Sequence, residues 1–279
     1  MPSAFTLGVI FILVTPSSTW LWVYTLVFAV GLSELAPTAA MTYQGVIIGM
    51  SLLTGSVLGP ILSDLADKKR DYRPSLTVIA TLTVIGDIGL LAAAKLGSLP
   101  LFVGAAMLIA SSNCTVVPVG NALSGTYAAA DPERAGLIAA LMLGAITVMP
   151  LVGNVSLGLC EFSLDDPRLL YILGPVHAGC LTAILALPSR FLRPHALLDL
   201  VPAEEQSTLR VVCAFFSSIV EWFVKAEYRA FLLVAAGMNF AYTPIQSSFS
   251  MLPYMLEDMG ELPSQRAIQD FVALWMSTG

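Results

Sequence analysis

Stretches of about 20 apolar residues recur along this chain, and most of the charged residues lie in short segments between them. Lipid offers no hydrogen-bond partners to the backbone, so a spanning segment of this length must be an α-helix. Of the 279 residues, 57% are apolar and only 11% are charged, which is too little polar surface to cover a soluble globule of this size. The sequence therefore predicts an all-α polytopic membrane protein whose main partner is the lipid bilayer.

Hydropathy predicts seven spans, at residues 8–35, 42–63, 74–96, 99–127, 134–160, 168–188 and 229–252. The first contains Thr-Pro-Ser-Ser-Thr at 15–19, and the apolar part before it is too short to cross alone. We therefore predict one broken helix there rather than two spans. Another apolar stretch, 267–276, is also too short to cross, so we expect an incomplete eighth helix.

The spans predict three regions: a six-helix transmembrane bundle at 1–188, a cytoplasmic linker at 189–228, and the start of a second bundle at 229–279. The linker is the only long polar connection, which is typical of a hinge between two units. Within it, apolar residues recur at helical spacing: Leu209, Val212, Phe216, Ile219, Val220 and Phe223. This pattern fits a helix on the cytoplasmic membrane surface, or equally a linker helix packed under the bundle.

The basic residues predict the orientation of the chain. With a cytoplasmic N-terminus, ten of the 13 Lys and Arg residues fall in inner segments, as the positive-inside rule requires. The outer segments then hold only Lys95, Arg168 and Arg266. Beyond the cluster at 68–73 there is no long basic tract, so nucleic-acid binding is not expected.

No residue cluster predicts a metal or another cofactor. The four cysteines have no CxxC or Cys/His spacing of a metal site or disulfide framework, and we interpret them as small buried residues. No Ser/His/Asp arrangement emerges either, so a membrane enzyme has the least support.

Asp87 is the sharpest candidate for a functional residue. It lies midway along an apolar stretch, where an ionised carboxylate costs roughly 2.5–3.5 kcal/mol on insertion scales, so it should face a cavity, a partner or a proton. We predict that it could carry a proton as the coupling ion. The alternative is a neutral aspartic acid that only packs helices, flanked by Gly86 and Gly89. His177 is expected to be a satisfied buried histidine rather than a proton relay, and Glu34 to lie at the interface.

A polar stripe in the seventh span is a candidate substrate path. Its members step by four, three and four residues and so share one helical face: Asn239, Thr243, Gln246 and Ser250, with Tyr242 beside them. Asn113 and Asn121 form a thinner version in the fourth span, with Thr115 and Ser124. Polar side chains also hold membrane helices together without any ligand, and the pattern alone leaves both interpretations open.

Small residues at four-residue spacing predict close helix packing. The pairs and triplet are Gly45 and Gly49, Gly55 and Gly59, and Gly136, Ala140 and Gly144.

The segment 59–74, GPILSDLADKKRDYRP, is similar to the loop between the second and third helices of the major facilitator superfamily. Asp64, Lys69 and Arg70 match the aspartate and the closing basic pair of that motif, and Gly59 adjoins the place of its first glycine. Pro60, Leu65 and Asp67 differ from the motif. The resemblance implies two six-helix bundles that alternate access to a central site, and a loop that acts in gating. Asp64 could pair with Lys68 or Arg70 and change partners as the bundles rock.

Within that superfamily, the segments 45–76, 85–94 and 131–145 are most similar to lysosomal members and to plant vacuolar phosphate transporters that bear an SPX domain. This resemblance implies a lysosomal or vacuolar membrane.

The function predicted from all these features is a secondary active transporter that moves a small solute or ion by alternating access, with protons as the driving ion. Two alternatives remain at this point. The span count is also that of a seven-helix receptor, and the incomplete eighth helix is also that of a truncated remnant that does not transport.

Overall fold

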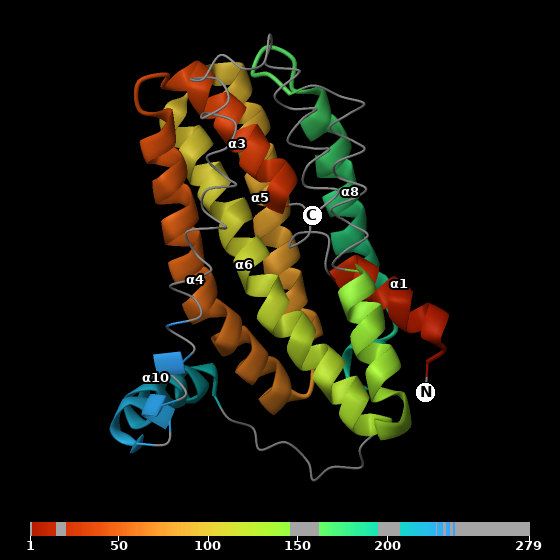
Figure 1. Ribbon diagram of the computed structural model, residues 1–279. Coiled ribbons are helices and arrows are strands. Elements are labelled where there is room, and N and C mark those ends of the chain that lie inside the picture. The colour runs from red at the N-terminus through yellow and green to blue at the C-terminus, as the bar shows by residue number, and fades with distance from the viewer. Residues whose placement is uncertain are drawn as a thin grey trace.

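The computed structural model describes residues 2–14, 21–145, 162–194, 207–226, 228–230, 233, 234 and 237. Within these residues the secondary structure is entirely helical, with no β-strand. Figure 1 shows the helices packed side by side in a bundle. Their bounds are α1 Ala4–Val14, α3 Leu21–Leu35, α4 Ala40–Lys69, α5 Arg73–Leu96, α6 Leu99–Ala130, the 3₁₀ turn η1 Pro132–Arg134, α8 Arg168–Ala186, α9 Ser189–Leu192 and α10 Thr208–Val224. Residues 135–145 are helical as well.

Four of these helices, α4, α5, α6 and α8, are long and apolar enough to cross a membrane. They correspond to the predicted spans 42–63, 74–96, 99–127 and 168–188, and they are consistent with the predicted multi-pass membrane protein. The main difference is at the end of α4, which continues six residues past the predicted span to Lys69. Hydropathy ends a span at its first charges, but a Lys-rich last turn favours the helix because it complements the negative end of the helix dipole.

The first predicted span is described as two helices, α1 and α3, and residues 15–20 lie outside the described part. The two helices share α6 as a neighbour and differ in the other one: α1 packs on α8, whereas α3 packs on α4. Of the predicted span 134–160, only residues up to 145 are described. The seventh span, 229–252, and the segment 267–276 lie outside the described residues, apart from a few positions up to 237.

α6 lies between α4 and α5 and contacts both along much of its length. Glycines permit this close approach. A Cβ added at Gly55 would lie 2.3 Å from Cβ of Cys114, one at Gly59 would lie 2.8 Å from Pro118, and one at Gly86 would lie 2.4 Å from Ile109. The prediction for Gly55 and Gly59 is therefore confirmed.

The described residues do not supply the other predicted small-residue contacts. Within the described residues, a Cβ at Gly45, Gly49, Gly136 or Gly144 would meet nothing within 4 Å. Spacing alone does not say which face of a helix meets a neighbour.

The buried apolar side chains form two clusters at different heights in the bundle. The first, which we call the distal cluster, includes Phe28, Phe102, Leu169 and Leu173. The second, the basic-end cluster, includes Val14, Leu76, Val116, Ile184 and Leu192.

Between the two clusters, α4, α5, α6 and α8 each contribute buried polar residues. We call this set the central polar layer; its members are Ser51, Thr83, Asp87, Ser112, Asn113, Thr115 and His177. Thr83 and Ser112 join α5 to α6 by a hydrogen bond of 2.7 Å. The layer crosses the bundle midway along helices whose outer surface is apolar.

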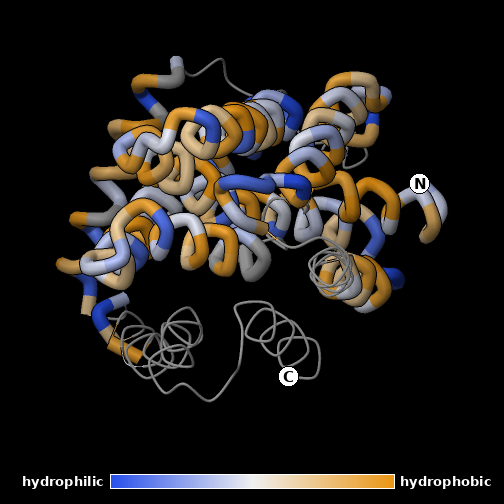
Figure 2. Tube along the Cα trace, turned by 90° about the horizontal axis from the view of Figure 1, so that it is seen from above, coloured by the Kyte–Doolittle hydropathy of each residue, from blue (hydrophilic) through white to orange (hydrophobic). Residues whose placement is uncertain are grey.

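The outer surface of the bundle is rich in large hydrophobic side chains. In the view along the bundle, hydrophobic residues occur around the helices as well as between them (Figure 2). Exposed examples include Leu53, Ile88, Leu143 and Leu185. Such a surface suits contact with lipid rather than water.

The basic residues gather at one end of the bundle, which we call the basic end. It holds Lys68, Lys69, Arg70, Arg73, Arg134 and Arg193. The chain begins at the same end, because Pro2 and Ala4 line one pocket together with Asp131 and Arg134. Lys95 and Arg168 lie at the opposite end.

The predicted linker helix is present as α10, which lies beside α4 near the basic end. Ser207 caps its N-terminus by accepting a hydrogen bond from the backbone N–H of Arg210 at 3.3 Å. Leu209, Phe216, Val220 and Phe223, from the predicted apolar stripe, are exposed. The division into regions at 189 and 228 stays a prediction.

Candidate functional site

Asp87 lies on α5 within the central polar layer and is only 1% exposed. Its neighbours Gly86 and Gly89 meet α6, where Ile109 and Ala105 fill the space of their missing side chains. One face of α5 is therefore used for packing, and Asp87 projects from a different face. A Cβ built at Gly174 of α8 would lie 3.9 Å from Cβ of Asp87, which places the carboxylate beside α8.

Two side chains from distant parts of the sequence meet the Asp87 carboxylate. Tyr24 of α3 donates its hydroxyl to Oδ1, and Nδ1 of His177 on α8 lies 2.7 Å from Oδ2. The Tyr24 hydroxyl is also 3.4 Å from Nδ1 of His177. Asp87, His177 and Tyr24 thus form one buried hydrogen-bonded unit, which we call the Asp–His–Tyr site.

Aromatic contacts hold the site from the side of α3. The rings of Tyr24 and His177 are stacked, with centroids 6.0 Å apart and an interplanar angle of 24°. Tyr24 also stacks on Phe28 at 5.8 Å, and Phe28 meets Phe102 of α6 edge to face at 6.5 Å. Such pairs contribute about 0.5–1.5 kcal/mol each beyond the area they bury, so the tyrosine is fixed by packing as well as by its hydrogen bond.

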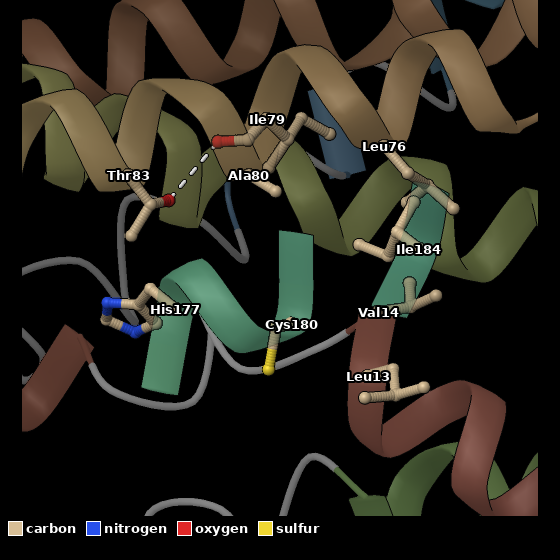
Figure 3. A pocket seen from close by; sticks show the side chains of 9 residues that line it. All are labelled: Leu13, Val14, Leu76, Ile79, Ala80, Thr83, His177, Cys180 and Ile184. Atoms are coloured by element: carbon tan, nitrogen blue, oxygen red, sulfur yellow. Dashed lines mark hydrogen bonds between the residues drawn. The ribbon is translucent and has the colours of Figure 1, made fainter. Parts of the chain in front are cut away.

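A small pocket adjoins the site between α1, α5 and α8. Figure 3 shows His177 and Thr83 at one end of it and Leu76, Ile184 and Val14 toward the other. The last three belong to the basic-end cluster. Apart from His177, Thr83 and Cys180, the lining is apolar.

The chemistry open to this site is proton exchange. An ionised carboxylate only accepts hydrogen bonds, whereas imidazole can both donate and accept, and can hold a second proton. A carboxylate and an imidazole in contact can therefore share a proton, and the pair has no net charge when it holds one proton more than an ionised carboxylate beside a neutral imidazole. Within the described residues, no group of three or more His, Cys, Asp or Glu side chains is placed to hold a metal ion.

The structure separates the two asparagines predicted to line a path. Asn113 is buried in the central polar layer, and neither its Oδ1 nor its Nδ2 has a hydrogen-bond partner among the described residues. Asn121 is exposed on the outside of α6, so the two do not share one surface. Eight residues is more than two helical turns, and the accumulated rotation places them on different faces. Asn239, Tyr242, Thr243, Gln246 and Ser250 lie outside the described residues.

The loop motif lies at the basic end, and its residues do not meet the Asp–His–Tyr site. Asp64 forms an ion pair with Lys68 at 2.8 Å, one of the two partners expected for it. Both residues are within α4, so the predicted loop shrinks to Arg70, Asp71 and Tyr72. Lys69 is exposed and Gly59 is buried against Pro118.

The short loop between α4 and α5 is tied to the segment that follows α8. The backbone N–H of Tyr72 donates to Leu192 at 2.9 Å, and Nε of Arg193 donates to Asp71 at 2.7 Å. Arg73 donates to the carbonyl of Leu187. These contacts close the basic end beneath the basic-end cluster.

His177 is the residue whose importance was missed from the sequence. The expectation that it is buried and hydrogen-bonded is correct, but its partner is Asp87, 90 positions away. One signal was available: both are titratable residues midway along predicted spans, and a buried carboxylate requires a partner at its own depth.

The described residues are entirely helical, with four helices that could cross a membrane and a buried acid–base unit between two apolar clusters. Comparison with models of known protein families finds no match for this chain, and neither does comparison with curated proteins.

Proposed function

We propose that this protein is a secondary active transporter that moves a small solute or ion across its membrane in exchange for, or together with, protons. The Asp–His–Tyr site is the observation that supports this most strongly. Its three side chains come from α3, α5 and α8, and all are at most 3% exposed. An acid–base unit that bridges three helices can couple protonation to their relative positions.

Packing alone does not account for a buried carboxylate at the position of Asp87. A carboxylate at this depth costs roughly 2.5–3.5 kcal/mol on insertion scales, and a buried ion pair is often no better for stability than apolar residues of similar size. An apolar residue in place of Asp87 would serve packing alone at least as well. The site is therefore better explained by a function than by stability.

The proposals for the orientation and the mechanism are supported by the sequence and by the basic residues at one end of the bundle. We propose that the basic end faces the cytoplasm, since it holds most of the basic residues and the start of the chain. The similarity of the segment 59–74 to the major facilitator loop supports alternating access. The Asp64–Lys68 pair is a half-buried contact at the basic end, of the kind that can break and reform between states.

The experiment is uptake into proteoliposomes that contain the full chain, with inorganic phosphate, amino acids and sugars as probes, with and without an imposed pH gradient. We expect the gradient to raise uptake of one probe class, and Asp87→Asn to abolish that dependence. Glu34→Gln is the matched control, because it makes the same chemical change at an exposed carboxylate. A dependence on the gradient that survives in Asp87→Asn would remove this site from the mechanism.

A further inference from the structure

One face of α10 is apolar and exposed. Each residue of an α-helix is rotated by about 100° from the one before it. Four large apolar side chains of α10 therefore fall within a sector of about 60°: Leu209, Phe216, Val220 and Phe223. They are 50–74% exposed. We call this set the apolar face of α10.

The other residues of α10 occupy two further faces. Arg210, Glu221 and Lys225 are exposed, and the centre of their sector lies about 140° from that of the apolar face. Glu221 and Lys225 form an ion pair along this polar face. Phe215 and Ser218 are partly covered, which places the contact of α10 with α4 on a third face. The apolar face is therefore not the one that packs on the bundle.

The axis of α10 crosses the direction of the long helices. In Figure 1, α4, α5 and α6 run lengthwise between the two ends of the bundle, whereas α10 is strongly foreshortened and lies beside the basic end of α4. With 30 residues, α4 is about 45 Å long, which exceeds the hydrocarbon core of about 30 Å. Its charged last turns lie at the basic end, so α10 is located where the long helices leave the apolar layer.

This position favours lipid as the partner of the apolar face. α4, the neighbour of α10, also has exposed apolar side chains, including Leu53 and Val57. The apolar face of α10 thus continues the outer surface of the bundle that suits contact with lipid. A helix with one strongly apolar face and a separate charged face, lying across the spanning helices at their ends, has the geometry of an interfacial helix.

We propose that α10 docks on the lipid bilayer at the basic end. Its apolar face is inserted at the boundary between acyl chains and headgroups, and its polar face is turned to the headgroups and water. Interfacial helices bury their apolar face about 5–10 Å deep at this boundary. The surface is separate from the Asp–His–Tyr site, and its lipid contact does not depend on transport.

Spin labels on two faces of α10 test the contact in the full chain, reconstituted in lipid vesicles. The four cysteines are first replaced by alanine: Cys114, Cys160, Cys180 and Cys213. One label is then attached to Val220→Cys on the apolar face, or to Ala214→Cys as the matched control, because Ala214 is exposed on the polar side. We expect the ratio of collisions with oxygen to collisions with a water-soluble nickel chelate to be at least about threefold higher for Val220→Cys.

The two reagents distinguish the possible environments of the apolar face. Equal ratios for Val220→Cys and Ala214→Cys would show that the apolar face is in water. Few collisions with either reagent at Val220→Cys would show that protein covers it, from a second copy or another partner. Either result would overturn the proposal. Leu209→Cys repeats the measurement at a second position of the apolar face, in case Val220→Cys does not fold.

A charge on the apolar face gives an independent test. Val220→Glu places a carboxylate at the lipid boundary, whereas Ala214→Glu places the same group on the polar side. In lipid nanodiscs, we expect the amide hydrogens of α10 to exchange at least about tenfold faster in Val220→Glu than in Ala214→Glu, because a helix that loses its contact opens more often. Equal exchange rates would contradict docking on lipid. Neither measurement depends on uptake, so this proposal and the proposed transport can fail separately.

Discussion

The contact between α4 and α6 at Gly55 allows a quantitative prediction about how the bundle is held together. An added methyl group at Gly55 would lie 2.3 Å from Cβ of Cys114, and 3.1 and 3.2 Å from backbone atoms of the same residue. Ordinary contact begins at 3.4 Å, so Gly55→Ala must separate the two helices locally by roughly 1 Å. Backbone atoms cannot rotate away as a flexible side chain can. We therefore expect the overpacking cost of about 1–3 kcal/mol seen in tightly packed interiors.

The matched control is Gly49→Ala on the same helix, where an added Cβ would meet no described atom within 4 Å. Both substitutions replace glycine in a helix interior and so carry the same gain of up to about 1 kcal/mol in helix propensity. Their difference in free energy of unfolding isolates the packing term, and we expect Gly55→Ala to be less stable by about 1–3 kcal/mol.

The assay is reversible unfolding in mixed micelles by titration with SDS, followed by tryptophan fluorescence. A double variant, Gly55→Ala with Cys114→Gly, should recover part of the loss because it removes the Cβ at 2.3 Å. If Gly55→Ala is as stable as Gly49→Ala, α4 and α6 have room for a methyl group at Gly55, and the prediction is refuted.

Two further predictions concern the basic end. Burial, followed by the hydrogen bond to Asp67, raises the pKa of the Tyr72 phenol well above its usual value of 10.0, so the neutral phenol is favoured in the folded state. The stabilisation is complete below pH 10 and is lost as the pH rises above that value. Above pH 10, the melting temperature of the wild type should therefore fall more steeply with pH than that of Tyr72→Phe. Parallel melting curves for the two proteins would contradict the prediction. Arg70 ends α4 with a φ of 53°, a left-handed conformation that costs a non-glycine residue about 1–2 kcal/mol. Arg70→Gly should exceed Arg70→Ala in stability by about that amount in the same SDS titration, and equal values would show that the backbone there is not strained.

The course of the long helices could be predicted from hydropathy, because the bilayer constrains length and composition together. α5 and α8 begin within a residue of the predicted positions. The end of α4 could not be predicted in the same way. Asp64 and Lys68 lie four residues apart on the surface of α4, and an ion pair at this spacing stabilises a helix. Hydropathy, in contrast, places the end of the span at these same charged residues.

The site could be predicted only in part. Asp87 is conspicuous because a carboxylate at mid-span is costly, but nothing local indicates which residue meets it. Tyr24 is one aromatic residue among many in apolar segments, and its role depends on packing between α3 and α8. Four-residue glycine spacing likewise marked Gly55 and Gly45 equally, although of the two only Gly55 meets a neighbouring helix within the described part of the chain.

The separation of Asp87 from His177 along the chain also has a consequence for biogenesis. Tyr24 precedes Asp87 and is already in place when α5 is made, but His177 follows it by 90 residues. At about 5–20 residues per second, Asp87 waits roughly 5–18 s for its imidazole. During that interval an ionised carboxylate would be held at mid-membrane by a single phenol. We infer that the nascent protein holds α5 near the interface until α8 inserts, so that insertion of the sixth predicted span buries Asp87 together with its partner.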